Sequence, residues 1–170
     1  VAPPLVLTSR GNIVQVQALN SRGEMLLVPV RVALNELEEV ALIEENSTLL
    51  TYEVQRSVAR FEEEDRSRQA SSFTVVRSLV ELFTGAEEHL GLYGAFGYDL
   101  AFQFEPIELK LTRPSDQRDL VLYIPDEIIV VDHQGGVAER RRYEFAYRDL
   151  STTNISRGGA RDLYQPDLEL

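Results

Sequence analysis

The chain has 170 residues, with 17 basic and 28 acidic side chains and a formal net charge of −11. Hydrophobic residues make up 44% of it and charged residues 26%, the composition of a globular protein, and its length fits one domain. The absence of Cys excludes disulfides, thiolate metal ligands and a Cys nucleophile, and it favours a reducing compartment, so we expect a cytoplasmic protein. The acidic balance argues against nucleic acid as a partner.

The sequence also argues against a membrane protein and a zinc enzyme. Even the apolar run Leu26–Leu34 is interrupted by Pro29 and Arg31 and falls short of the roughly 18 residues that span a bilayer. His89 and His133 are the only histidines, so a three-His zinc site is impossible. The chain begins with Val and carries no signal-peptide pattern, so we expect a piece of a longer polypeptide.

The first predicted elements are a strand and a helix. In Asn12–Leu19 apolar residues alternate with Gln, the pattern of a strand with one buried face. Asn20–Gly23 breaks this pattern. Glu24–Val40 has a helical composition, but Pro29 is unfavourable inside a helix, so we expect either a kink at Pro29 or a helix that begins near it.

An acidic window covers Glu36–Asp65, which contains ten acidic residues and two Arg. Two interpretations remain open: an acidic partner-binding face, or a solvated surface with a mobile connection. The second is favoured, because runs of charge usually lie in solvent. Within the window, Thr51–Val54 is predicted to be a short strand.

The clearest helix follows Ser71 and Ser72, which are good N-caps, and Gly85 is expected to stop it. Its apolar residues recur at helical spacing. They are Phe73, Val76, Leu79, Val80 and Phe83. Arg77 and Glu81 lie four residues apart on its polar side, where an ion pair is expected.

Three evenly spaced glycines, Gly91, Gly94 and Gly97, mark the segment Gly91–Asp99. Their spacing differs from the G-x-G-x-x-G of dinucleotide-binding loops, and no Lys-Ser/Thr of a phosphate loop follows. A buried strand whose glycines admit a close neighbour is favoured over a ligand-binding segment, and both interpretations remain open.

The C-terminal half contains strand and turn patterns. Asp119–Ile124 and Glu127–Val131 are rich in β-branched residues, and Asp132–Gly136 is a turn. Val137–Tyr147 is expected to return as the second strand of an antiparallel hairpin. Arg140–Arg142 is better explained as an exposed strand end than as a nucleic-acid patch in so acidic a chain.

Together these elements predict an α+β fold, a mostly antiparallel sheet with helices packed on one face. The strands around Val14, Phe96, Leu122 and Val130 should share the sheet, and the helix that follows Ser71 should cover its apolar face. The predicted core consists of Phe73, Val76, Val80, Phe83, Val14, Val16, Phe96, Leu122, Ile129 and Val131. If Phe96 is buried, Phe96→Ala should cost about 3 to 5 kcal/mol.

No constellation of catalytic or metal-binding residues is evident. Asp132 and His133 are neighbours at a strand end, so their side chains diverge and cannot form the orienting pair of a triad. Clustered acids such as Glu87–Glu88 suit solvent better than a divalent cation. The residues alone therefore predict a domain over residues 1–148 without an active site, followed by a linker or tail over 149–170.

Three stretches, in this order and at these separations, carry a resemblance to a known family. They are Leu92–Asp99, Asp119–Tyr123 and Ile129–Gln134. They resemble the N-terminal region of anthranilate synthase component I, and the similarity runs from about Leu5 to Tyr147. The segment Gly91–Leu111 is most similar to the form in which synthase and glutaminase are fused.

The resemblance implies a lyase that aminates chorismate and eliminates pyruvate to give anthranilate, the step that opens tryptophan biosynthesis. It also implies Mg²⁺ to hold the substrate, and an amidotransferase domain or subunit that supplies ammonia from glutamine. In that family the chorismate and Mg²⁺ ligands lie in a chorismate-binding domain, which would follow Leu170. This chain would then contain no catalytic residue and no metal ligand, and it would be inactive alone.

Feedback inhibition by tryptophan in this family uses a pocket between an N-terminal L-L-E-S segment and the later domain. That segment would precede Val1, and the nearest string, Leu42–Glu45, lies elsewhere and lacks the Ser. Arg77 occupies the family's S-x-F-x-x-x-R position, which implies a place beside the pocket. A surface Arg paired with Glu81 is the favoured alternative.

Two alternative functions remain open. Aminodeoxychorismate synthase component I shares these motifs, and a free-standing, non-catalytic binding module with the same fold is the other. If the chain is cut from a longer enzyme, its severed apolar interface is expected at Gly91–Gly97 and Tyr98–Phe104. The isolated chain would then self-associate through this surface.

Overall fold

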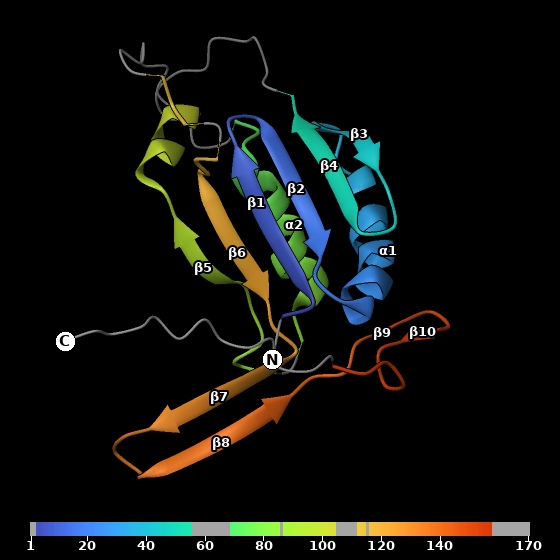
Figure 1. The fold of residues 1–170 in the computed structure, drawn as a ribbon, viewed down its shortest axis with the longest axis vertical. Helices are drawn as coiled ribbons and strands as arrows, with labels where there is room; N and C mark the ends of the chain where they lie inside the picture. Colours follow the sequence, from blue (N-terminus) through green and yellow to red (C-terminus); the bar gives the residue numbers. More distant parts are fainter. Residues whose placement is uncertain (1–2, 56–68, 86, 105–111, 115, 158–170) are drawn as a thin grey trace, which may run out of the picture.

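The computed structural model describes residues 3–55, 69–85, 87–104, 112–114 and 116–157, and Figure 1 shows how they are arranged. A six-stranded sheet carries two α-helices on one face, and every neighbouring pair of its strands is antiparallel. The predicted α+β fold, with a mostly antiparallel sheet, is confirmed.

At the centre of the sheet, a strand from the beginning of the chain pairs with a strand from its C-terminal half. The strands of the sheet are β1 (Leu5–Arg10), β2 (Ile13–Ala18), β3 (Val40–Glu45), β4 (Leu49–Val54), β5 (Tyr93–Phe96) and β6 (Leu120–Ile124). They lie in the order β3-β4-β2-β1-β6-β5. The alternation predicted for β2 is confirmed, because Val14, Val16 and Ala18 are buried while Gln17 is exposed. The strands β1 and β3 were not predicted.

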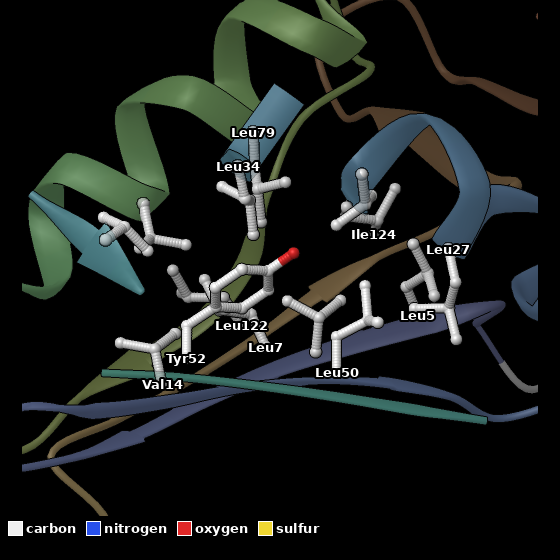
Figure 2. Close-up of a cluster of buried hydrophobic side chains, with 14 of the residues drawn as sticks. Leu5, Leu7, Val14, Leu27, Leu34, Leu50, Tyr52, Leu79, Leu122 and Ile124 are labelled. Carbon is white, nitrogen blue, oxygen red and sulfur yellow. The ribbon is translucent and has the colours of Figure 1, made fainter. Parts of the chain in front are cut away.

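Alternate residues of the central strands point toward the helices and form the core (Figure 2). Leu7 of β1 lies directly opposite Leu122 of β6, and side chains opposite each other in antiparallel strands share a face. Tyr52 of β4 is fully buried among them, and its hydroxyl donates a 3.2 Å hydrogen bond to Oδ1 of Asn35. Burial, reinforced by the charge of Glu45, raises the pKa of Tyr52 to about 12.

The first helix, α1, spans Ser21–Asn35 and contains Pro29 in its interior. Asn20 caps it, because its side chain accepts hydrogen bonds from the backbone N–H groups of Arg22 and Gly23. The strand pattern does end before Asn20–Gly23, as predicted, but the predicted helix start near Pro29 is wrong. The cap and the burial of Leu26, Val30 and Leu34 in the core together offset the cost of Pro29.

The second helix, α2, spans Ser72–Phe83 and confirms the predicted cap at Ser71, which forms a capping box with Thr74. The helix ends with Thr84 as its C-cap, just before the predicted stop at Gly85.

The predicted core residues fall into three groups: buried, partly buried and exposed. Val14, Val16 and Leu122 are buried, and Phe73, Val76 and Phe83 are partly buried against the core. The prediction is wrong for Val80, Phe96, Ile129 and Val131, which are exposed. In α2 the buried line runs through Ser72, Val75 and Leu79, so Val80 turns toward solvent.

The glycine-spaced segment forms a strand as predicted, but this strand is not buried. β5 is the last strand of the sheet, and all four of its residues are exposed. Phe96 stacks on Phe73 of α2 with ring centroids 5.6 Å apart, yet it remains 54% exposed. The cost expected for Phe96→Ala, which assumed a buried ring, no longer applies.

The predicted C-terminal hairpin is present, but it does not join the main sheet. It consists of β7 (Glu127–Asp132) and β8 (Val137–Arg142), which form a sheet of their own. The prediction that the strand around Val130 shares the main sheet is therefore wrong. Pro125 and Asp126 separate β6 from β7, and the hairpin lies beyond the end of the sheet (Figure 1). A shorter pair follows, β9 (Ala146–Tyr147) with β10 (Leu150–Ser151).

Most acids in the described part of the acidic window are exposed, which agrees with both interpretations left open for it. Its acids at positions 36, 38, 39, 44 and 45 are exposed, and its backbone forms β3 and β4. The predicted strand Thr51–Val54 is confirmed within β4. Residues 56–65 of the window lie outside the described residues, so the predicted mobile connection stays a prediction.

Gly94→Ala is expected to detach β5, because a Cβ at this position would lie 1.9 Å from the carbonyl oxygen of Val121 in β6. Backbone atoms cannot move aside cheaply, so we expect a loss of about 1 to 3 kcal/mol in urea denaturation. Gly91→Ala is the matched control, since a Cβ there meets nothing within 4 Å. Equal stability of the two variants would show that the β5–β6 contact is looser than described.

Candidate functional site

The described residues contain no arrangement of acids and histidines suited to a metal ion. No group of three or more His, Asp or Glu within them is placed to bind one. Asp132 instead accepts a 2.9 Å hydrogen bond from the backbone N–H of Gln134, and His133 is exposed in the turn. Among the same residues, no helix is long and apolar enough to cross a membrane.

Arg77, the one regulatory candidate from the sequence, is an exposed residue of α2. It lines a surface hollow between α1 and α2, together with Glu81 and Leu37. Within the described chain it forms no ion pair with Glu81, so the pair expected from their spacing is absent. The hollow does not show whether Arg77 lies beside a tryptophan pocket, and this place stays a prediction.

A buried guanidinium at the start of α1 is the most unusual polar feature of the molecule. Arg22 is only 1% exposed, and its Nε lies 2.5 Å from Oδ2 of the equally buried Asp126. Its Nη2 donates to Oε2 of Glu144 at 2.9 Å and to the carbonyl of Tyr143 at 3.0 Å. Its Nη1 donates to the carbonyl of Thr152 at 2.7 Å.

A second arginine completes this group. Arg157 donates through Nη2 to Oε1 of Glu144 at 2.5 Å, and its Nε lies 3.5 Å from Asp126. We call Arg22, Asp126, Glu144 and Arg157 the Arg22 cluster. Two guanidiniums balance two carboxylates, so the cluster is formally neutral. It fastens both ends of the β7–β8 hairpin to α1.

The acids near the hairpin are held in their charged form. Burial raises the pKa of Glu144, but hydrogen bonds from Thr152, Arg22 and Arg157 outweigh it, so the pKa lies below its ordinary value of 4.5. The hydrogen bond from Arg142 lowers the pKa of Glu127 in the same way. Both carboxylates are therefore ionised at neutral pH and act as acceptors rather than proton donors.

A second polar group fixes the opposite end of the sheet. The buried Asp119 accepts a 2.6 Å hydrogen bond from the backbone N–H of Gly11 and forms an ion pair with Arg113. Arg113 also lies 3.0 Å from Asp99, which belongs to a 3₁₀ helix, Tyr98–Gln103. These contacts tie the 3₁₀ helix to the β1–β2 turn.

The apolar surface predicted around the 3₁₀ helix is only partly exposed. Tyr98 is 87% exposed and packs edge-on against Phe102, with ring centroids 6.4 Å apart. Phe102 and Phe104 are half-buried, and Phe104 stacks on Phe73. The surface is therefore narrower than the sequence indicated, because these rings cover one another.

Similar proteins are found along nearly the whole chain, although no family model matches it. It is 46% identical over 166 residues to an anthranilate synthase of Azospirillum brasilense, which covers 97% of this chain and 22% of that protein. It is 34% identical over 148 residues to anthranilate synthase component 1 of Serratia marcescens, covering 84% of this chain and 27% of that protein. The chain belongs to the anthranilate synthase family.

The chain corresponds to an N-terminal fragment of an anthranilate synthase. A third relative, component 1 of Vibrio parahaemolyticus, is 34% identical over 127 residues, 73% of this chain and 23% of that protein. The chain spans about a quarter of the length of the curated relatives that it matches.

The Arg22 cluster is the part of this anthranilate synthase region that sequence reasoning missed. Its four residues are distant in the chain, and no spacing rule connects position 22 with positions 126, 144 and 157. A weak signal was the Arg immediately after an Asn-Ser N-cap, where acids are normally preferred. Thr152, inside the predicted tail over 149–170, is fully buried beside the cluster, and the domain boundary itself stays a prediction.

Arg22→Met is expected to destabilise the chain by about 3 to 5 kcal/mol, because it leaves Asp126 buried without its closest counter-charge. Arg31→Met is the matched control, since Arg31 pairs with Glu45 at 2.9 Å on the exposed surface and should contribute less than about 1 kcal/mol. Urea denaturation measures both. Similar losses in the two variants would contradict a special role for the buried pair.

Stability should fall in acid because of Glu144. Its folded pKa is below its unfolded value, so its contribution is present above about pH 4.5 and disappears as the pH falls through the folded pKa. Urea denaturation at a series of pH values should show this loss. Glu144→Gln should flatten the curve below pH 4.5, whereas Glu88→Gln, a change at an exposed position, should not. Parallel curves for both variants and the unchanged chain would contradict this assignment.

Proposed function

We propose that the chain is the N-terminal scaffold and regulatory region of an anthranilate synthase. The complete enzyme converts chorismate, with glutamine or ammonia, to anthranilate and pyruvate in tryptophan biosynthesis. The observation that carries this proposal is the 46% identity over 97% of the chain to a protein named anthranilate synthase.

The catalytic residues are proposed to lie in a chorismate-binding domain outside this chain. The described residues support this placement, because their buried acids are already paired with arginines and none gathers as a metal site. These residues do not fit the Mg²⁺ that the family is expected to use. The ion would therefore be bound by the chorismate-binding domain, and the chain alone would be inactive.

A glutamine amidotransferase, as a fused domain or a separate subunit, is the proposed second partner. The aligned 166 residues are 22% of the Azospirillum brasilense protein, whereas 162 residues are 30% of component 1 of Haemophilus influenzae. The Azospirillum protein, which is named anthranilate synthase without a component number, is therefore the longer of the two. The higher identity to the longer relative favours the fused form.

Regulation by tryptophan, a cytoplasmic location and self-association of the isolated chain remain proposals. Arg77 is the proposed neighbour of a tryptophan pocket, supported by its position in the motif and its exposure on α2. The exposed Phe96 and Tyr98 support self-association, which light scattering of the chain at millimolar concentration would test.

Product identity tests the proposed reaction. The complete synthase, supplied with chorismate, glutamine and Mg²⁺, should release fluorescent anthranilate, and the 170-residue chain alone should release none. Formation of aminodeoxychorismate would assign the related synthase instead. Absence of either product from the complete protein would favour a non-catalytic binding module.

A further inference from the structure

Residues 126–157 form a part of the chain that shares no strand pairing with the main sheet. Among the described residues, their four strands pair as β7 with β8 and β9 with β10. The backbone passes from the sheet to this part at Pro125, directly after β6, and the part lies beyond the end of the sheet (Figure 1). We call residues 126–157 the C-terminal unit.

A single side chain makes nearly all of the polar contacts that join the C-terminal unit to the rest of the described chain. The guanidinium of Arg22 contacts two carboxylates and three backbone carbonyls of the unit. They belong to Asp126, Tyr143, Glu144, Thr152 and Ile155. A further contact, between Arg141 and Glu87, is 3.8 Å long and lies at the surface. Because the partners of Arg22 are distributed along the whole unit, they lose their donor together when the guanidinium leaves.

The apolar contact between the C-terminal unit and the helices is incomplete. Phe145 packs edge-on against Phe83 of α2, with ring centroids 5.5 Å apart. Beside this pair lies a pocket of about 240 Å³, lined by Met25 and Pro29 of α1 and by Tyr147 of the unit. Atoms that line an empty space lack packing partners on that side. The apolar contact therefore holds the unit less firmly than a filled core would.

The C-terminal unit has little stability of its own. A two-stranded hairpin is at best marginally stable in water, and β9 and β10 contain only two residues each. The strand pairs of the unit should therefore melt once it separates from α1. Proteins open in cooperative units of this kind, with free energies below that of global unfolding.

We propose that the C-terminal unit opens as one cooperative element about Pro125, and that Arg22 is the latch that keeps it closed. Departure of the one guanidinium releases the hairpin and the β9–β10 segment in a single step. The destabilisation expected for Arg22→Met then falls on this unit and leaves the main sheet folded. A ligand or partner that prefers either the closed or the open state would shift the equilibrium between them. The inference is independent of the proposed function, because it concerns contacts within the chain.

Hydrogen exchange of the unchanged 170-residue chain, at urea concentrations below its unfolding transition, tests the cooperative opening. Amides of β7, β8 and residues 150–156 should converge on one opening transition, at a lower urea concentration than amides of β1 and β2. Separate transitions for the hairpin and the β9–β10 segment would overturn the single unit. One transition shared with β1 and β2 would overturn an opening that leaves the sheet folded.

Arg22→Met tests the latch, with Arg31→Met on the same helix as the matched control. Arg22→Met should accelerate exchange in the C-terminal unit about a hundredfold or more, because Asp126 loses its closest counter-charge, while β1 and β2 exchange as before. Arg31→Met should change exchange in the unit less than about twofold, since its ion pair with Glu45 is exposed. Unchanged exchange in the unit, or equal acceleration in the unit and in β1 and β2, would overturn the latch. The test in urea uses the unchanged chain, so it decides the cooperative opening even if Arg22→Met does not fold.

Discussion

The buried guanidinium of Arg22 determines where the chain after β6 lies. From the first turn of α1 it contacts Asp126, before the hairpin, and the carbonyls of Tyr143 and Thr152, after it. A placement that kept Arg22 or Asp126 buried without the other would leave a buried charge without its counter-ion, at a cost of several kcal/mol. Buried ion pairs add little net stability compared with apolar packing, so we infer that the core supplies the stability and Arg22 selects the arrangement.

The central strands of the sheet are well covered by the helices, whereas the edge strand β5 is exposed. β1 lies between β2 and β6, and its apolar side chains are covered by the two helices. At one margin, β5 depends on Gly94, whose missing side chain lets the strand approach β6. Its aromatic residues are covered only in part, by Phe73 and by each other.

Local patterns predicted β2, α2, β6 and the hairpin, because each depends on its own periodicity or turn residues. The start of α1 was missed because Gly23 and Pro29 disfavour helices locally, while the close approach of Gly23 to the carbonyl of Pro4 requires a glycine there. Burial was mispredicted at Ile129 and Val131 because periodicity identifies an apolar face without showing whether the same chain covers it. The Arg22 cluster has no local pattern at all, since it exists only after four distant segments have met.

In the Arg22 cluster and in the group around Asp119, the carboxylates are paired with arginines of the same chain. Asp126 and Glu144 are paired with arginines, and Asp119 with Arg113 and the amide of Gly11. The ion pairs neutralise these carboxylates, although both side-chain oxygens of Asp126 are buried without a hydrogen-bond partner. What the described region still offers is apolar surface, on the hairpin and beside the 3₁₀ helix. Apolar surface of this kind agrees with the proposed scaffold role, under which changes in this region should alter activity through assembly rather than chemistry.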